Sequence, residues 1–289
     1  MCTANYNGTM AGTALFVVLV GILASPLEAV YIRITAFEQA FNQTWSHPAH
    51  DGASVLSLIQ RLRPTVLNRF VTGLPDPHAT VPFPSGTPPM PYADYLTRAM
   101  AAGGPGCTIA PKVHLNSIWP DTYRMAAAAA LRNLSVTPRL TRLDLDCYFS
   151  NGTNAQHKDT LEAFLGMGWE RLGFNFVGGD RKCFGLVSYG EAAIQPGSWT
   201  VSLAGLNDMK MDGVGERLAH IDYPEAIGEF ARLSGDKQAA VLTQIAASQR
   251  AHNFSFIWPV LYSGYDATKV VLSDGNTTVF DVIERLIGG

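Results

Sequence analysis

Between two helical patterns the chain contains a strand-like segment, residues 142–148, that reads Arg142-Leu143-Asp144-Leu145-Asp146-Cys147-Tyr148. Successive side chains of a β-strand point to opposite faces. The two leucines and Cys147 therefore share one face, and the two aspartates and Tyr148 share the other. Because the aliphatic face has to pack against helices, the carboxylates are expected on the inner side of a sheet that is covered by helices on its outer side.

The rest of the chain repeats this unit of a strand followed by a helix. Strand-like segments lie at 30–35, 65–72, 108–116, 139–148, 171–177, 184–189, 217–223 and 253–261. Helical patterns lie at 53–62, 92–102, 121–133, 156–167, 223–252 with a break near Ser234-Gly235, and 279–286. Eight such strands predict a single (β/α)8 barrel of the TIM type over residues 30–289. The alternative is an open doubly wound α/β sheet, although no G-x-G-x-x-G turn supports a dinucleotide site.

The first 29 residues have the pattern of a secretory signal peptide. The apolar stretch at 14–24 is shorter than the roughly 20 residues that a membrane-spanning helix needs. We therefore expect a secreted, extracellular protein without stable membrane association after cleavage, and keep an uncleaved membrane anchor as the alternative. Glycosylation sequons support secretion and predict N-glycans at Asn42, Asn133, Asn151 and Asn276.

The charge of the chain bears on its binding partners, and its cysteine content bears on disulfide formation. A net charge of −3, with 21 basic and 24 acidic residues and no basic run, argues against a nucleic-acid partner. Cys147 and Cys183 fall near the ends of predicted strands and are expected to form a disulfide, with Cys107 as a buried free thiol. Three buried free cysteines are the alternative.

Polar residues on the inner faces divide by depth. Asp144, Arg33 and Lys112 lie early on their strands, which predicts a buried ion-pair layer. Active sites of this fold lie at the carboxyl ends of the strands. The residues predicted there as catalytic are Asp146, Asp222 and Glu191. Those predicted to bind substrate are His114, Asn116, Tyr148, Asn175, Arg69, Tyr189, Glu225 and Trp258.

Two carboxylates on opposite sides of such a site are the machinery of glycoside hydrolysis, with Asp146 and either Asp222 or Glu191 sharing the acid and base roles. An acid after strand four and another after strand seven resembles the large clan of retaining (β/α)8 glycoside hydrolases, although that clan has an Asn-Glu pair where this chain has Asp146-Cys147. The same segment is similar to the D-x-D-x-E motif of the chitinase family, with Tyr148 in the place of the catalytic glutamate. Aromatic residues near strand ends are expected either to stack on sugar rings or to seal the core: Trp119, Tyr148, Trp199, Tyr223, Trp258 and Tyr262.

Three functions stay open at this point. The first is a secreted glycosidase that acts on a carbohydrate as a monomer without a cofactor. The second is a non-catalytic carbohydrate-binding or host-interacting protein. The third is a metal-dependent hydrolase that uses His114, Asp146, His220 and Asp222.

Overall fold

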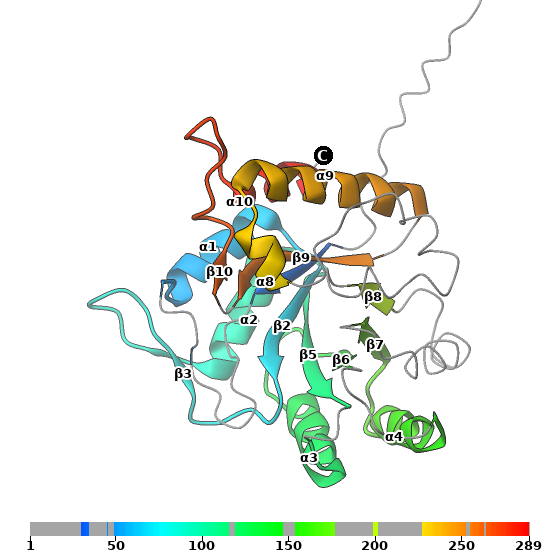
Figure 1. Ribbon diagram of the computed structural model, residues 1–289. Helices are drawn as coiled ribbons and strands as arrows, with labels where there is room; N and C mark the ends of the chain where they lie inside the picture. Colours follow the sequence, from blue (N-terminus) through cyan, green and yellow to red (C-terminus); the bar gives the residue numbers. More distant parts are fainter. Residues whose placement is uncertain are drawn as a thin grey trace, which may run out of the picture.

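The computed structural model describes residues 30–34, 45, 49–115, 119–146, 154–176, 199–201, 227–252, 255–262 and 264–288. Over these residues strands and helices alternate, and the strands form a mostly parallel sheet with helices packed around it (Figure 1). The chain is therefore a mixed α/β protein, as predicted. The predicted strands at 184–189 and 217–223 lie outside the described residues.

The large sheet follows the order of the chain. Its parallel strands are β1 (Tyr31–Ile34), β2 (Val66–Thr72), β5 (Thr108–His114), β6 (Arg142–Asp146), β7 (Arg171–Phe176), β8 (Trp199–Val201) and β9 (Ser255–Tyr262). The short strand β10 (Tyr265–Asp266) turns back antiparallel to β9. On its side away from β2, β1 pairs in parallel with β9, where Tyr31 is in register with Ile257.

Most of these strands were predicted from the sequence, but the short strands β3, β4, β8 and β10 were not. The predicted segments at 30–35, 65–72, 108–116, 139–148, 171–177 and 253–261 each contain a strand. Strand β8 lies in a stretch rich in glycine and methionine for which the sequence indicated no element. Within the proline-rich loop after β2, strands β3 (Thr80–Val81) and β4 (Met90–Pro91) form a separate small antiparallel pair.

The helices lie close to their predicted positions. They are α1 (Gly52–Leu62), α2 (Tyr92–Gly103), α3 (Asp121–Arg132), α4 (Asn154–Gly166), α8 (Ile227–Arg232), α9 (Gly235–His252) and α10 (Val279–Gly288). The expected break near Ser234-Gly235 separates α8 from α9. A Cβ at Gly235 would lie 2.4 Å from the carbonyl oxygen of Val271, so glycine allows the loop before α10 to pack closely here.

The two faces of the sheet have different surroundings. Ile32, Leu67 and Leu143 belong to the main hydrophobic core, which also contains the buried faces of the helices. Tyr31 and Val66, their neighbours along β1 and β2, form a separate small cluster with Ala110 and Ile257 on the other face. The alternation that the sequence predicted is confirmed, and it leaves an inner face that is separate from the helix-covered one.

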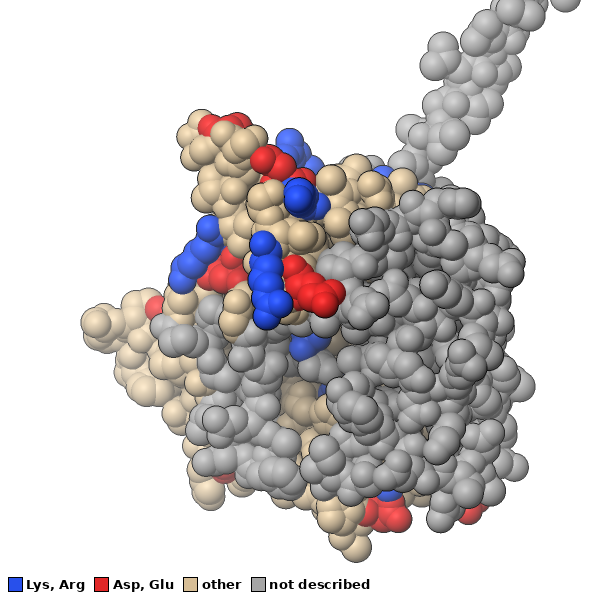
Figure 2. All heavy atoms as spheres, in the orientation of Figure 1, with Lys and Arg blue, Asp and Glu red and all other residues tan. Residues whose placement is uncertain are grey.

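Charged residues on the surface include both signs. Figure 2 shows basic and acidic side chains interspersed on the described part of one face. Within the described ranges, no helix combines the length and the apolar character needed to cross a membrane.

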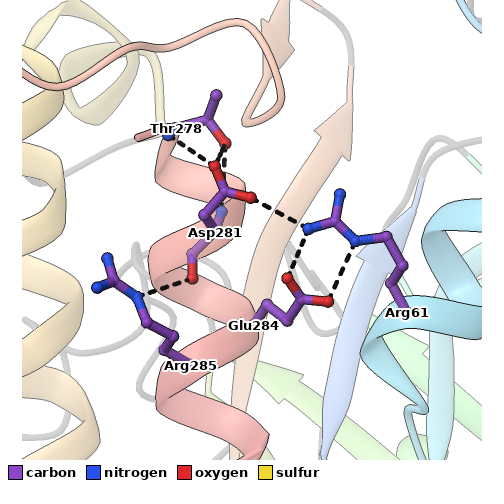
Figure 3. Close-up of polar contacts among 5 residues, drawn as sticks. All are labelled: Arg61, Thr278, Asp281, Glu284 and Arg285. Atoms are coloured by element: carbon purple, nitrogen blue, oxygen red, sulfur yellow. Dashed lines mark hydrogen bonds and ion pairs between the residues drawn. The ribbon is translucent and has the colours of Figure 1, made fainter. Parts of the chain in front are cut away.

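A polar cluster joins α1 to α10. Arg61 donates hydrogen bonds to both oxygens of Glu284, at 3.1 and 2.5 Å, and to Asp281 at 3.1 Å (Figure 3). Its guanidinium also lies 4.5 Å from the centre of the Phe280 ring. The first and last described helices are thus held side by side over the core.

Candidate functional site

A buried carboxylate occupies the inner face of β6. Asp144 is fully buried, and its two oxygens accept hydrogen bonds from Arg142 Nε at 2.6 Å and from Asn68 Nδ2 at 2.7 Å. Arg142 Nη1 donates to the hydroxyl of Tyr31 at 2.7 Å, and its guanidinium carbon lies 4.9 Å from the centre of that ring. Both oxygens of Asp144 are thus hydrogen-bonded, and Arg142 supplies the opposite charge, which is what burial of a carboxylate requires.

The predicted ion-pair layer is therefore present around Asp144, but its partner there is Arg142, which was not among the residues predicted for this layer. Arg142 precedes Asp144 by two positions and so shares its face, a signal that the alternation already contained. Lys112 is also fully buried, and its backbone is in register with Asp144 on the neighbouring strand. Arg33 is half-buried on β1.

Electrostatics keeps this arginine charged. Burial alone would lower the pKa of Arg142, but the negative charge of Asp144 and the hydrogen bonds from Arg142 to Asp144 and Tyr31 outweigh burial and raise it. Arg142 and Asp144 form a buried salt bridge. Such a pair is costly to break, because removal of one partner leaves the other charge buried.

Gly173 on β7 provides the space for this ion pair. A Cβ at this position would lie 2.1 Å from Asp144 Oδ1 and 2.2 Å from Arg142 Nη2. The glycine is next to Asp144 in the register of β6 and β7. Sequence reasoning did not select Gly173, since a single glycine within a strand indicates only a bulge or a close approach, not the group that approaches.

Further toward the carboxyl ends of the strands, polar residues form a row in the sheet register. His114, Asp146 and Asn175 are direct neighbours across β5, β6 and β7. In the sheet register this row continues through Thr200 on β8 to Ser255, which is the first residue of β9 and therefore lies at the amino end of that strand. Three of the predicted site residues are thus adjacent at one edge of the sheet. Thr200 was missed because β8 was not predicted, and Ser255 because hydroxyl residues without an evident base carry little signal.

His114 is the member of this row whose side chain the structure describes. Its ring is partly buried, and its centre lies 4.7 Å from that of Trp119 in an edge-to-face contact. Tyr123 of α3 packs on the other side of Trp119, with ring centres 4.9 Å apart, and accepts a hydrogen bond from the backbone of Leu74. The imidazole is therefore held by aromatic packing at the end of β5.

The aromatic residues predicted to stack on sugars include two that the structure describes in full, and both are core residues. Trp119 is 3% exposed, and Trp258 is fully buried, with its ring against Phe256. Trp258 lies next to Ile257, so it points away from the inner face and into the main core. For these two residues the structure favours the alternative in which aromatics near strand ends seal the core.

Other predicted residues cannot be placed in the same way. Arg69 lies on β2, Asp146 is the last residue of β6, and Asn175 is the last residue but one of β7. Only the backbones of these three residues are described. The remaining predicted residues lie outside the described residues: Asn116, Tyr148, Tyr189, Glu191, His220, Asp222, Glu225, Cys147, Cys183, Asn42 and Asn151.

Among the described residues, neither the cysteine nor the potential metal ligands indicate a second functional site. Cys107 is a buried free cysteine, and burial raises the pKa of its thiol to about 12, so it is inert as a nucleophile at neutral pH. Among the described residues no three His, Cys, Asp or Glu side chains are grouped so that they could hold a metal ion.

The chain matches no family model, and no curated protein matches it.

Proposed function

We propose that this chain is a secreted hydrolase that cleaves glycosidic bonds at the carboxyl ends of the parallel strands of a (β/α)8 barrel. The observation that carries the proposal is the register row of His114, Asp146 and Asn175 on three adjacent strands, directly beyond the buried ion pair. An imidazole, a carboxyl group and a carboxamide at the ends of neighbouring strands are the groups needed for acid-base chemistry on a polyhydroxylated substrate.

Several pairings support the barrel. Strand order follows chain order without the reversal of a doubly wound sheet, and β1 has parallel partners on both sides, β2 and β9. Side chains also meet across the inner face. Asn68 reaches Asp144 past β5, and Tyr31 reaches Arg142 past both β2 and β5. In a flat sheet three strand spacings amount to about 14 Å, so the sheet curves strongly around these residues.

The two aspartates of β6 have different roles in this proposal. Asp144 has both oxygens occupied and no exposure to water, so it serves as structural support. Asp146 lies two residues further along β6, at the carboxyl end of the strand, and acts as the acid or base. The second carboxyl group is that of Asp222 or Glu191. His114, Asn116, Asn175 and Arg69 orient substrate hydroxyls, while Tyr148, Tyr189 and Glu225 complete the substrate site and Trp258 stays a core residue.

The second candidate is a non-catalytic carbohydrate-binding or host-interacting protein on the same fold, which Tyr148 in the place of a glutamate favours. The third is a metal-dependent hydrolase with His114, Asp146, His220 and Asp222 as ligands. A disulfide between Cys147 and Cys183, a monomeric state and secretion by the 29-residue leader remain part of the proposal.

Substitution of Asp146 tests the function. On a polysaccharide that the wild-type protein cleaves, we expect Asp146→Asn to reduce the turnover rate by about 100-fold or more, because general acid-base catalysis contributes on that scale. Asp94→Asn is the matched control, since Asp94 is an exposed carboxylate in the first turn of α2 and is not a member of the row.

The outcomes separate the three candidates. Full activity of Asp146→Asn would remove Asp146 from the mechanism. Inactivity of the wild-type chain across a broad glycan panel with binding retained would favour the non-catalytic protein. Activity that a chelator abolishes and added metal restores would favour the metal-dependent hydrolase.

A further inference from the structure

We propose that Asn276 carries an N-linked glycan, and that the glycan is attached before helix α10 forms. The sequon is Asn276-Thr277-Thr278, at the end of the loop that joins β10 to α10. This proposal rests on the secretion proposed above but is independent of the hydrolase activity, because glycan mapping requires no turnover.

A tight turn presents Asn276 to solvent. The carboxylate of Asp274 accepts hydrogen bonds from the backbone N–H groups of Asn276 at 2.9 Å and Thr277 at 2.8 Å, and from the hydroxyl of Thr277 at 2.5 Å. Gly275 has a φ of 74°, a conformation that favours glycine. Asn276 itself is exposed. The turn therefore holds the acceptor amide at the surface, where a bulky polar group can be accommodated.

The position of the loop leaves the candidate site open. Figure 1 shows the loop before α10 projecting from the molecule on the side away from α3 and α4, and Figure 2 shows its tip standing clear of the body. Strand β5 ends near α3 in the same view. A glycan at Asn276 would shield the α10 side without covering the carboxyl end of β5.

The timing follows from Thr278, the third residue of the sequon. Its hydroxyl donates to Asp281 Oδ2 at 2.6 Å and accepts from the backbone N–H of Asp281 at 3.2 Å, while its own N–H donates to Asp281 Oδ2 at 2.8 Å (Figure 3). This reciprocal arrangement is a capping box at the start of α10. A glycosyltransferase that reads the threonine hydroxyl therefore finds it accessible only while the first turn of α10 is unformed.

The sequon at Asn133 provides an internal comparison. Asn133 is the exposed C-terminal cap of α3, and Ser135, the third residue of its sequon, is also exposed. Asn276 and Asn133 thus share exposure of the acceptor and differ in the third residue, which is part of a helix cap only at Thr278.

Expression of the full chain in a glycosylating eukaryotic host tests the modification. Enzymatic removal of N-glycans followed by peptide mass spectrometry should convert Asn276 to aspartate in the secreted protein. A second preparation carries a foreign secretory leader ahead of the full chain, so that entry into the secretory compartment does not depend on the native leader. An unmodified Asn276 in the protein that enters by its own leader would overturn the proposal. If only the preparation with the foreign leader is modified, the acceptor site is competent but the native modification is disproved.

Variants at Thr278 separate the glycan from the helix cap. Thr278→Ser keeps both functions, and Thr278→Asn keeps a capping side chain but destroys the sequon. Thr278→Ala removes both. We expect the glycan at Asn276 to be lost in Thr278→Asn and Thr278→Ala. Asn276→Gln also lacks this glycan and keeps the helix cap, so Thr278→Asn should have the same melting temperature as Asn276→Gln. Retention of the glycan in Thr278→Asn would contradict the assignment of this sequon.

The order of events is tested with full-length protein made without glycans. When this protein is incubated with purified oligosaccharyltransferase, we expect no glycan transfer to Asn276 while the protein is folded. After unfolding, the same protein should accept a glycan at Asn276. Transfer at Asn133 reports that the folded sample and the enzyme are competent. Equal transfer to Asn276 in the folded and unfolded protein would overturn the timing.

Discussion

Two of the arginine-carboxylate clusters among the described residues differ chiefly in their surroundings. In the inner cluster, Arg142 and Asp144 have side chains that are 7% and 0% exposed. In the outer cluster, Arg61 is 45% exposed, and its partners Asp281 and Glu284 are 37% and 35% exposed. Both arginines use more than one donor, and both lie against an aromatic ring.

The difference shows how burial changes the consequence of the same contact. Water solvates the groups of the outer cluster when one partner leaves, and salt screens their attraction. No solvent replaces a lost partner in the inner cluster, so the remaining charge pays the full cost of desolvation. We therefore expect substitutions with the same chemistry to have large effects at Asp144 and small effects at Glu284.

The largest effect is expected for Asp144→Asn. The change leaves Arg142 without its counter-charge and turns an acceptor of the Asn68 amide into a donor. Unfolding free energy should fall by about 3–5 kcal/mol, measured by urea denaturation. The double variant Arg142→Met with Asp144→Leu should recover part of the loss, because an apolar pair leaves no buried charge. A loss below about 1 kcal/mol would show that the inner cluster is solvated like the outer one.

The sequence predicts some members of the inner cluster and not others. The alternation of leucine and aspartate in β6 predicted that Asp144 is buried and inward, because a period of two fixes the face. Asn68 and Tyr31 could not be assigned as partners, since their contacts span strands that are not adjacent in the sheet. Strand β8 was missed because it is three residues long and is held by pairing with β7 and β9 instead of by local preference.

An intermediate effect is expected for Gly173→Ala. The added methyl group overlaps Asp144 Oδ1 and Arg142 Nη2, and both side chains are held in place by hydrogen bonds to each other and to Tyr31 and Asn68. Overpacking of this kind costs about 1–3 kcal/mol, seen as a lower urea midpoint. The matched control is Gly166→Ala at the end of α4, where a Cβ meets nothing within 4 Å and helix propensity makes alanine neutral or stabilising. Equal stability of the two alanine variants would show that the ion pair can shift to make room.

The smallest effect is expected in the outer cluster. Glu284→Gln should lower the free energy of unfolding by about 0.5–1 kcal/mol at low salt and by less in 1 M NaCl, since the pair is half-exposed.

The pH dependence of stability provides a second test of the outer cluster. The Thr278 hydroxyl, then its backbone N–H and Arg61, lower the pKa of Asp281, although partial burial opposes them. A lowered pKa means that this stabilisation is complete above the unfolded value near 3.9 and is lost as the pH falls through the folded pKa. The stability of Asp281→Asn should therefore depend less on pH below about 4 than that of the wild-type protein, whereas the Glu284→Gln variant keeps the Thr278 contribution. Identical acid profiles for the wild-type protein and Asp281→Asn would show that ionisation of Asp281 does not contribute to stability.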